Sequence, residues 1–200
     1  HRDGMGGAGM RRLILALVLL VVAPAARAET MITSLSTHRL QITSSFIGSQ
    51  IVLFGAIERD AQTISRAGGY DLAVVVRGPR AMVVTRQKSR VFGIWVNTDS
   101  RYFVDTPSFF AVHSNRPVDQ VTSLENRRLH QISFDGLVLK RPGGRVEAML
   151  PDTFVASFIR LKVADSFYQD KPNAVTFLSP NLFRATVTIP AEAAVGVYAV

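Results

Sequence analysis

Residues 71–97 read DLAVVVRGPRAMVVTRQKSRVFGIWVN and carry the densest β-strand signal in the chain. Val74 to Val76 are β-branched and favour a pleated surface, and Gly78-Pro79 interrupts them before Met82 to Val84 resume the pattern. A basic segment then leads to a third apolar run, Val91 to Val96. We therefore predict a strand, a turn, a second strand, a basic connector and a third strand.

Further apolar runs of strand length lie on both sides of this stretch. They are His38–Thr43, Gln50–Ile57, Arg101–Val104, Ser108–His113, Ala174–Leu178 and Leu182–Ile189. Because connections of helix length do not separate most of them, the spacing favours an antiparallel sandwich over a parallel α/β sheet. Gly196-Val197-Tyr198 has the pattern of the tyrosine corner in immunoglobulin-like domains. We predict a mainly β, immunoglobulin-like antiparallel sandwich, C-terminally truncated at Val200 inside a strand whose partner is missing.

Between these strands the pattern changes to that of helices. Asp119–His130 has a weak helical pattern, whereas Asp152 can cap a stronger helix of about 16 residues. In that helix Phe154, Phe158 and Leu161 fall at i, i+4 and i+7, which predicts one apolar face. The sandwich is therefore expected to contain a helical insertion over about residues 117–172.

Two segments remain open or irregular. The residues around Arg141-Pro142-Gly143-Gly144 fit either a hairpin or irregular structure. The polar, glycine-ended segment between Ile57 and Asp71 is expected to be a loop.

The N-terminal region has the pattern of a secretory signal peptide. Met10-Arg11-Arg12 forms a short positive segment, Leu13–Ala23 is apolar, and Ala26-Arg27-Ala28 is a small-x-small cleavage site. A transmembrane helix is the alternative, but the apolar run is shorter than the roughly 20 residues that spanning requires. We predict that residues 1–28 are a lead and signal peptide, that Met10 is the start, and that an exported domain begins at Glu29.

Composition limits the remaining possibilities. The chain has 200 residues with 48% hydrophobic content, which suffices for one domain with a good core. It has no cysteine, so disulfides, thiolate nucleophiles and thiolate metal sites are excluded. The net charge of +8 includes four arginines of the predicted targeting segment. Nucleic acid is not an expected partner, because basic residues do not alternate with aromatic ones as in single-strand binders.

Five basic residues form the candidate binding site. They are Arg77, Arg80, Arg86, Lys88 and Arg90. If residues 85–91 are extended, the last three share one face and could bind phospholipid headgroups or an acidic partner. The alternative is a solvated edge strand that its charges protect from aggregation.

Histidines offer little support for catalysis. His38, His113 and His130 stand singly on separate segments, without the spacing of a metal site. Ser108 and Ser114 flank His113, with Asp105 near, but no nucleophile elbow is present. We predict no catalytic residues, no metal and no cofactor, and keep a hydrolase or metal-dependent enzyme around His113 as the alternative.

Aromatic side chains are expected to serve the core. Trp95 lies between Ile94 and Val96 in a predicted strand, where a lone tryptophan is most often buried. A carbohydrate or hydrophobic ligand platform is the alternative at this position. Phe154, Phe158 and Phe167 are expected to pack on the sandwich, with an exposed docking face as the alternative.

Seven segments together resemble the putative transmembrane proteins of alphaproteobacteria. They are IVLFGAIE (51–58), LAVVVRGP (72–79), VFGIWVN (91–97), PSFFAVHSNRP (107–117), FIRLK (158–162), residues 175–178 with 182–184, and IPAEAAVGVY (189–198). The resemblance covers most of the chain from about residue 30. It implies a signal peptide, an exported β-rich region and one membrane helix near the C-terminus, often encoded beside sulfite-exporter-like permeases. No such helix is present by Val200, so a single-pass anchor is expected beyond it.

These observations together give an expected function. We expect a non-enzymatic periplasmic module, held at the inner membrane, that serves a membrane partner such as a transporter. No small-molecule substrate is indicated. A purely structural protein of the cell envelope is a further alternative.

Overall fold

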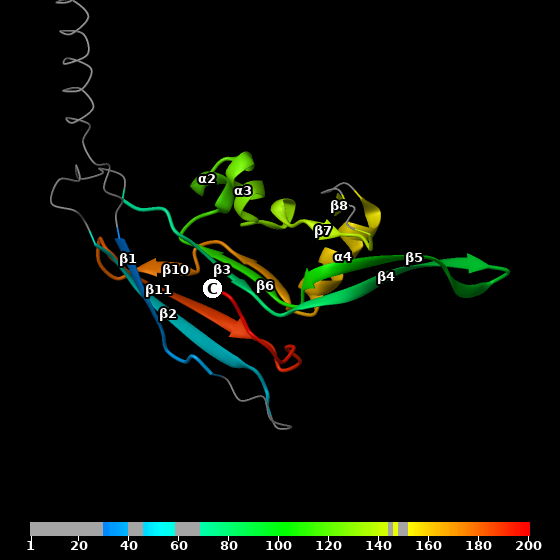
Figure 1. The fold of residues 1–200 in the computed structure, drawn as a ribbon, viewed down its shortest axis with the longest axis horizontal. Helices are drawn as coiled ribbons and strands as arrows, with labels where there is room; N and C mark the ends of the chain where they lie inside the picture. The colour runs from blue at the N-terminus through cyan, green and yellow to red at the C-terminus, as the bar shows by residue number, and fades with distance from the viewer. Residues whose placement is uncertain (1–29, 40–45, 59–68, 144–145, 148–151) are drawn as a thin grey trace, which may run out of the picture.

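The computed structural model describes residues 30–39, 46–58, 69–143, 146–147 and 152–200, which form a mainly β fold (Figure 1). The first sheet has the order β1-β2-β11-β10, the second β3-β6-β9 and the third β4-β5-β7-β8. The strands are β1 (Thr30–Leu35), β2 (Ser49–Glu58), β3 (Ala73–Arg77), β4 (Arg80–Val91), β5 (Ile94–Pro107), β6 (Phe110–Ser114), β7 (Leu139–Lys140), β8 (Val146–Glu147), β9 (Tyr168–Lys171), β10 (Val175–Phe177) and β11 (Leu182–Ile189).

The first sheet is antiparallel throughout and presents one apolar face. Along β11 the side chains of Phe183, Ala185, Val187 and Ile189 are buried at every second position. This period of two is what a strand with one face on a core requires. The strand predicted at residues 50–57 and the predicted hairpin of residues 174–189 are confirmed as β2 and as β10 with β11.

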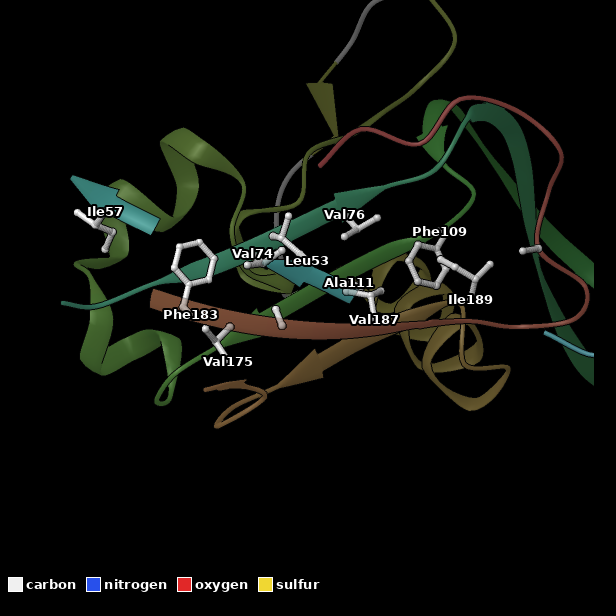
Figure 2. Packing of buried hydrophobic residues seen from close by; sticks show 12 residues of the cluster. Leu53, Ile57, Val74, Val76, Phe109, Ala111, Val175, Phe183, Val187 and Ile189 are labelled. Atoms are coloured by element: carbon white, nitrogen blue, oxygen red, sulfur yellow. The ribbon is translucent and has the colours of Figure 1, made fainter. Parts of the chain in front are cut away.

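The first core lies between the first and second sheets (Figure 2). Leu53, Val187 and Phe183 of the first sheet meet Val74 and Ala111 of the second sheet there. In the second sheet β3 and β6 are antiparallel, but β6 and β9 run parallel. The prediction of purely antiparallel pairing is wrong at β9, because the long helical connection lets the chain return to the sheet in the same direction as β6.

The opposite face of the second sheet packs on the helical segment, so β6 is buried along its whole length. The predicted helix is confirmed as α4 (Thr153–Ala164), where the Asp152 side chain accepts hydrogen bonds from the backbone N–H groups of Phe154 and Val155. Phe154 and Phe158 are buried and Phe167 is partly buried against this second core, as predicted.

The weakly predicted helix at residues 119–130 is divided into two. The structure contains α2 (Val118–Val121) and α3 (Leu124–His130), followed by the short 3₁₀ helix η1 (Phe134–Gly136). The Ser123 side chain accepts a hydrogen bond from the backbone N–H of Asn126 and caps α3, which explains the break. The strands on either side of residues 141–144, β7 and β8, pair antiparallel as in the hairpin alternative, while residues 144 and 145 lie outside the described residues.

The third sheet contains a long hairpin that projects to one end of the molecule (Figure 1). Two boundaries predicted here are wrong: the basic segment belongs to β4, and β5 continues to Pro107. The turn lies at Phe92-Gly93, inside the apolar run predicted as one strand. These two residues have φ angles of 50° and 84°, which places both in the left-handed region that a tight hairpin turn needs.

The C-terminal residues contact the second sheet. The Tyr198 hydroxyl donates a hydrogen bond to the Ala194 carbonyl at 2.8 Å, but the strand predicted to begin at Gly196-Val197-Tyr198 is reduced to an isolated bridge at Ala199. Ala199 and Arg77 exchange two backbone hydrogen bonds of 2.8 Å, which adds the end of the chain to the outer edge of β3. The predicted signal peptide, most of the predicted strand 38–43 and the loop at 59–68 lie outside the described residues.

Candidate functional site

The five basic residues predicted as one site separate into two groups. Arg77 is half-buried, and its Nη2 donates hydrogen bonds to the carbonyls of His130 (2.8 Å) and Gln131 (3.2 Å) at the end of α3. Burial, and then the charge of Arg80, lowers the pKa of Arg77. Arg77 therefore attaches the helical segment to β3 and is not available as a surface cation.

Arg80 also has a structural partner. Its Nη1 lies 2.9 Å from Oδ2 of Asp105, and Nζ of Lys140 lies 2.9 Å from the same oxygen. The hydrogen bond from Lys140 lowers the pKa of the Asp105 carboxyl, with the Arg80 charge acting in the same direction. This three-residue cluster connects β4, β5 and β7 at the base of the hairpin.

The other three basic residues lie together on the projecting part of the hairpin. Because side chains alternate along a strand, Arg86, Lys88 and Arg90 share one face of β4, and all three are exposed. In the register of the hairpin Arg90 is directly opposite Trp95, so both side chains lie on this face. We call Arg86, Lys88, Arg90 and Trp95 the basic face of the hairpin.

Apolar side chains surround the turn at the end of the hairpin. Phe92 and Ile94 are exposed there, and Val91 pairs with Ile94 across the turn. We call Phe92, Ile94 and Trp95 the hairpin tip. The prediction that Trp95 belongs to the core is wrong, because Trp95 is 67% exposed and the hairpin extends beyond both cores, where none of the described helices and strands covers its end (Figure 1).

The sequence contained one signal for this tip that the strand prediction missed. Phe92-Gly93 separates Val91 from the β-branched and aromatic run Ile94-Trp95-Val96, and a two-residue turn containing glycine is typical of hairpins. Because residues 91–96 were interpreted as one strand, the turn was not predicted and Trp95 was expected in the core.

The base of the hairpin is firmly held. Phe103 of β5 is completely buried, with its ring centroid 5.8 Å from that of Phe158 on α4. Arg101 forms an ion pair with Asp152, and its guanidinium lies 4.4 Å from the centroid of the Phe154 ring. One face of the hairpin base is therefore part of the second core, while the basic face remains in solvent.

His113, the residue of the enzymatic alternative, is enclosed between the two sheets. It is completely buried, and neither ring nitrogen has a hydrogen-bond partner of good geometry among the described residues. Burial lowers the pKa of His113; the nearby Lys171 charge acts in the same direction, and Gln169 and the Thr186 backbone partly oppose it. The ring is thus neutral near pH 7, and no serine hydroxyl or carboxylate of the described residues hydrogen-bonds to it.

Carboxylates gather at a separate shallow pocket of about 350 Å³ beside α3 and β9. Asp119, Asp135 and Asp170 line it with Arg127. Burial, followed by the charges of Asp135 and Asp119, raises the pKa of Asp170. Within the described part of the chain no group of three or more histidine, aspartate or glutamate side chains is placed to hold a metal ion.

A larger apolar groove of about 700 Å³ lies at the open side of the first core. Leu53, Val74, Val187 and Tyr198 are among its lining residues. The outer edge of β3 borders this groove, and Arg77 is the residue of that edge bonded to Ala199. Thr37, His38 and Arg39 also line the groove, which places His38 apart from His113.

Comparison with curated proteins gave no match, and comparison with solved structures gave none either. Within the described ranges no helix is long and apolar enough to cross a membrane. A protein-family model described as "Putative transmembrane protein (Alph_Pro_TM)" matches residues 30–200. The match covers both cores and the whole hairpin, and so the chain belongs to this transmembrane protein family.

Proposed function

We propose that the chain is a non-enzymatic module that docks at a membrane through the β4–β5 hairpin and serves a membrane partner there, such as a transporter. The observation that carries this proposal is the hairpin itself, which presents exposed apolar side chains beyond both cores. Exposed apolar groups of this kind indicate an interaction surface, because contact between large apolar side chains and water is unfavourable. Membership of a transmembrane protein family supports a location at the membrane.

The proposed location is the periplasmic face of the inner membrane. It rests on the signal-peptide pattern of residues 1–28 and on a single-pass anchor expected beyond Val200. We also propose that the first core is an immunoglobulin-like sandwich. Two facing sheets and the hydrogen bond from Tyr198 to Ala194 support this proposal, while the parallel pairing of β9 is a departure from that fold.

The burial of His113 argues against the enzymatic alternative. A general base must reach the proton it removes, directly or through one water molecule, and a nucleophile must meet its substrate. The His113 ring lies in the interior, and in the part of the chain that the structure describes no nucleophile lies in hydrogen-bond geometry with it. A binding role through the surface is therefore the better supported of the two functions.

Site-specific photocrosslinking of the full-length protein in its native membranes tests this function. A photoreactive residue replaces Phe92 in one variant and Leu129 in a second, since Leu129 is an exposed apolar residue of α3 far along the chain from the hairpin. We expect adducts to membrane components from position 92 and not from position 129. Adducts from position 129 alone, or none from either position, would contradict the proposed role of the hairpin.

A further inference from the structure

We propose that the hairpin tip inserts into the interfacial layer of a bilayer that contains anionic phospholipid, with the basic face bound to the phosphate groups. This inference rests on the proposed function and specifies the partner of the same hairpin. Four observations support it: the exposure of the tip, the conformation of Phe92, the position of the cations and the rigid base of the hairpin.

The large apolar side chains of the hairpin tip are highly exposed. Phe92 is fully exposed, at 101% of its reference area, and Ile94 and Trp95 are 68% and 67% exposed. Trp95 lies on the basic face opposite Arg90, Ile94 lies on the other face opposite Val91, and Phe92 is in the turn between them, so the end of the hairpin is apolar on both faces. Aromatic residues, tryptophan above all, favour the level of the lipid headgroups because the ring is apolar and the indole N–H remains hydrogen-bonded.

The backbone at Phe92 supports a role for its side chain. Its φ of 50° lies in the left-handed region, where asparagine, aspartate or glycine would be accommodated with less strain. A bulky residue at this turn position costs conformational energy, and the structure offers the ring no contact in return, since it is fully exposed. A contact outside the chain explains why the turn carries an aromatic ring.

The cations lie where lipid phosphates would meet the hairpin. Arg90 is opposite Trp95, with Lys88 and Arg86 following at every second position away from the tip. Cations placed just behind an apolar tip can bind headgroup phosphates while the tip reaches the upper acyl chains. Among the hairpin carboxylates, Asp99 pairs with Gln87 and so lies on the other face.

The rigid base provides a reason why insertion needs little reorganisation. Phe103 in the second core and the ion pair of Arg101 with Asp152 fix the hairpin to α4. The tip is thus presented in advance by a two-stranded arm, and binding does not have to order a flexible loop.

Trp95 makes the experiment direct, because it is the only tryptophan of the chain. Purified protein is mixed with phosphatidylcholine vesicles, either alone or containing phosphatidylglycerol, and tryptophan emission and vesicle co-sedimentation are recorded. We expect emission to move to shorter wavelength, and protein to sediment, with the anionic vesicles only. Brominated lipid should quench Trp95.

Two variants and one matched control separate insertion from other modes of binding. Ile94→Asp should weaken vesicle binding about tenfold or more, since it places a charge among the apolar tip groups. Arg86→Gln with Lys88→Gln and Arg90→Gln should weaken it about a hundredfold and remove the dependence on phosphatidylglycerol. Leu129→Asp exchanges an equally exposed apolar residue elsewhere and should have no effect.

The inference is overturned if the protein does not bind anionic vesicles, if it binds without any change in Trp95 emission, or if Ile94→Asp binds normally. A failure of the lipid inference can be distinguished from a failure of the proposed function. Hairpin-dependent crosslinks to a membrane protein, together with absent vesicle binding, would show a protein partner at the tip, so that the proposed function stands while the lipid inference fails.

Discussion

Gly55 of β2 lies opposite Phe183 of β11, and the Phe183 ring covers the glycine. A Cβ built on Gly55 would be 2.2 Å from Cζ and 2.5 Å from Cε1 of that ring. Carbon atoms that are not bonded to each other do not approach so closely, so a Gly55→Ala variant must displace Phe183. The ring has little room, because it is 1% exposed and packs beside Phe177 with centroids 6.1 Å apart.

Overpacking of this kind costs about 1–3 kcal/mol of unfolding free energy. Alanine restricts the unfolded chain relative to glycine, which returns about 0.4–1 kcal/mol. The expected net loss for Gly55→Ala is therefore about 1–2 kcal/mol. Urea denaturation followed by circular dichroism measures this loss. The comparison is valid if the unfolding free energy of the variant and that of the parent depend on urea concentration with the same slope.

A double-mutant cycle identifies the cause. Phe183→Leu alone leaves a small cavity and should cost about 1–2 kcal/mol. In the double variant the new methyl group occupies space that the shorter side chain has left, so the two losses should not add, and the coupling energy should reach about 1 kcal/mol. Additive losses, or a Gly55→Ala variant as stable as the parent, would refute the packing argument.

Three further predictions concern a helix cap, a buried histidine and the C-terminal turn. Asp152→Ala should cost about 1–2 kcal/mol by removing the cap of α4 and the partner of Arg101, and Asp152→Asn should recover most of it if the cap dominates; urea denaturation compares the two. Because burial lowers the pKa of His113, the unfolded chain takes up a proton below about pH 6.5 more readily than the folded chain, so the unfolding free energy should fall as the pH drops below about 6.5. His113→Leu should flatten this slope in pH-dependent denaturation, and an unchanged slope would contradict the assignment. Tyr198→Phe removes the hydroxyl bonded to Ala194 and should cost about 0.5–1.5 kcal/mol by the same measurement, whereas no change would mean that the turn does not depend on this bond.

The parts of the fold that local pattern determines could be predicted from the sequence. The apolar run of β2 indicates a buried strand, the alternation of β11 shows which of its faces is buried, and Asp152 marks the start of α4 by its capping chemistry. These features depend on neighbours within a few residues. The pairing of strands depends instead on residues far apart in the chain, which is why the parallel position of β9 beside β6 was not predictable from strand spacing.

The hairpin was predicted least well because its sequence resembles a core strand. Val91 to Val96 is as apolar as β3, and only tertiary structure reveals that the strands continue past the last helix that could cover them. The separation of the five basic residues into two groups was not predictable for a related reason. Arg77 and Arg80 meet partners distant in sequence, His130 and Asp105, and such partners leave no trace in local spacing.

The closure of the first sheet has a consequence for the order of folding. Ser49 of β2 pairs with Ile189 of β11, residues roughly 140 positions apart in the chain. Contacts between such distant residues require a large loop to be closed before any stabilisation is gained, so they form late and slowly. The two facing sheets cannot enclose their core until nearly the whole domain has left the ribosome. A polypeptide that stays open until β11 emerges remains suited to passing through a narrow translocation channel, in keeping with the export proposed for it.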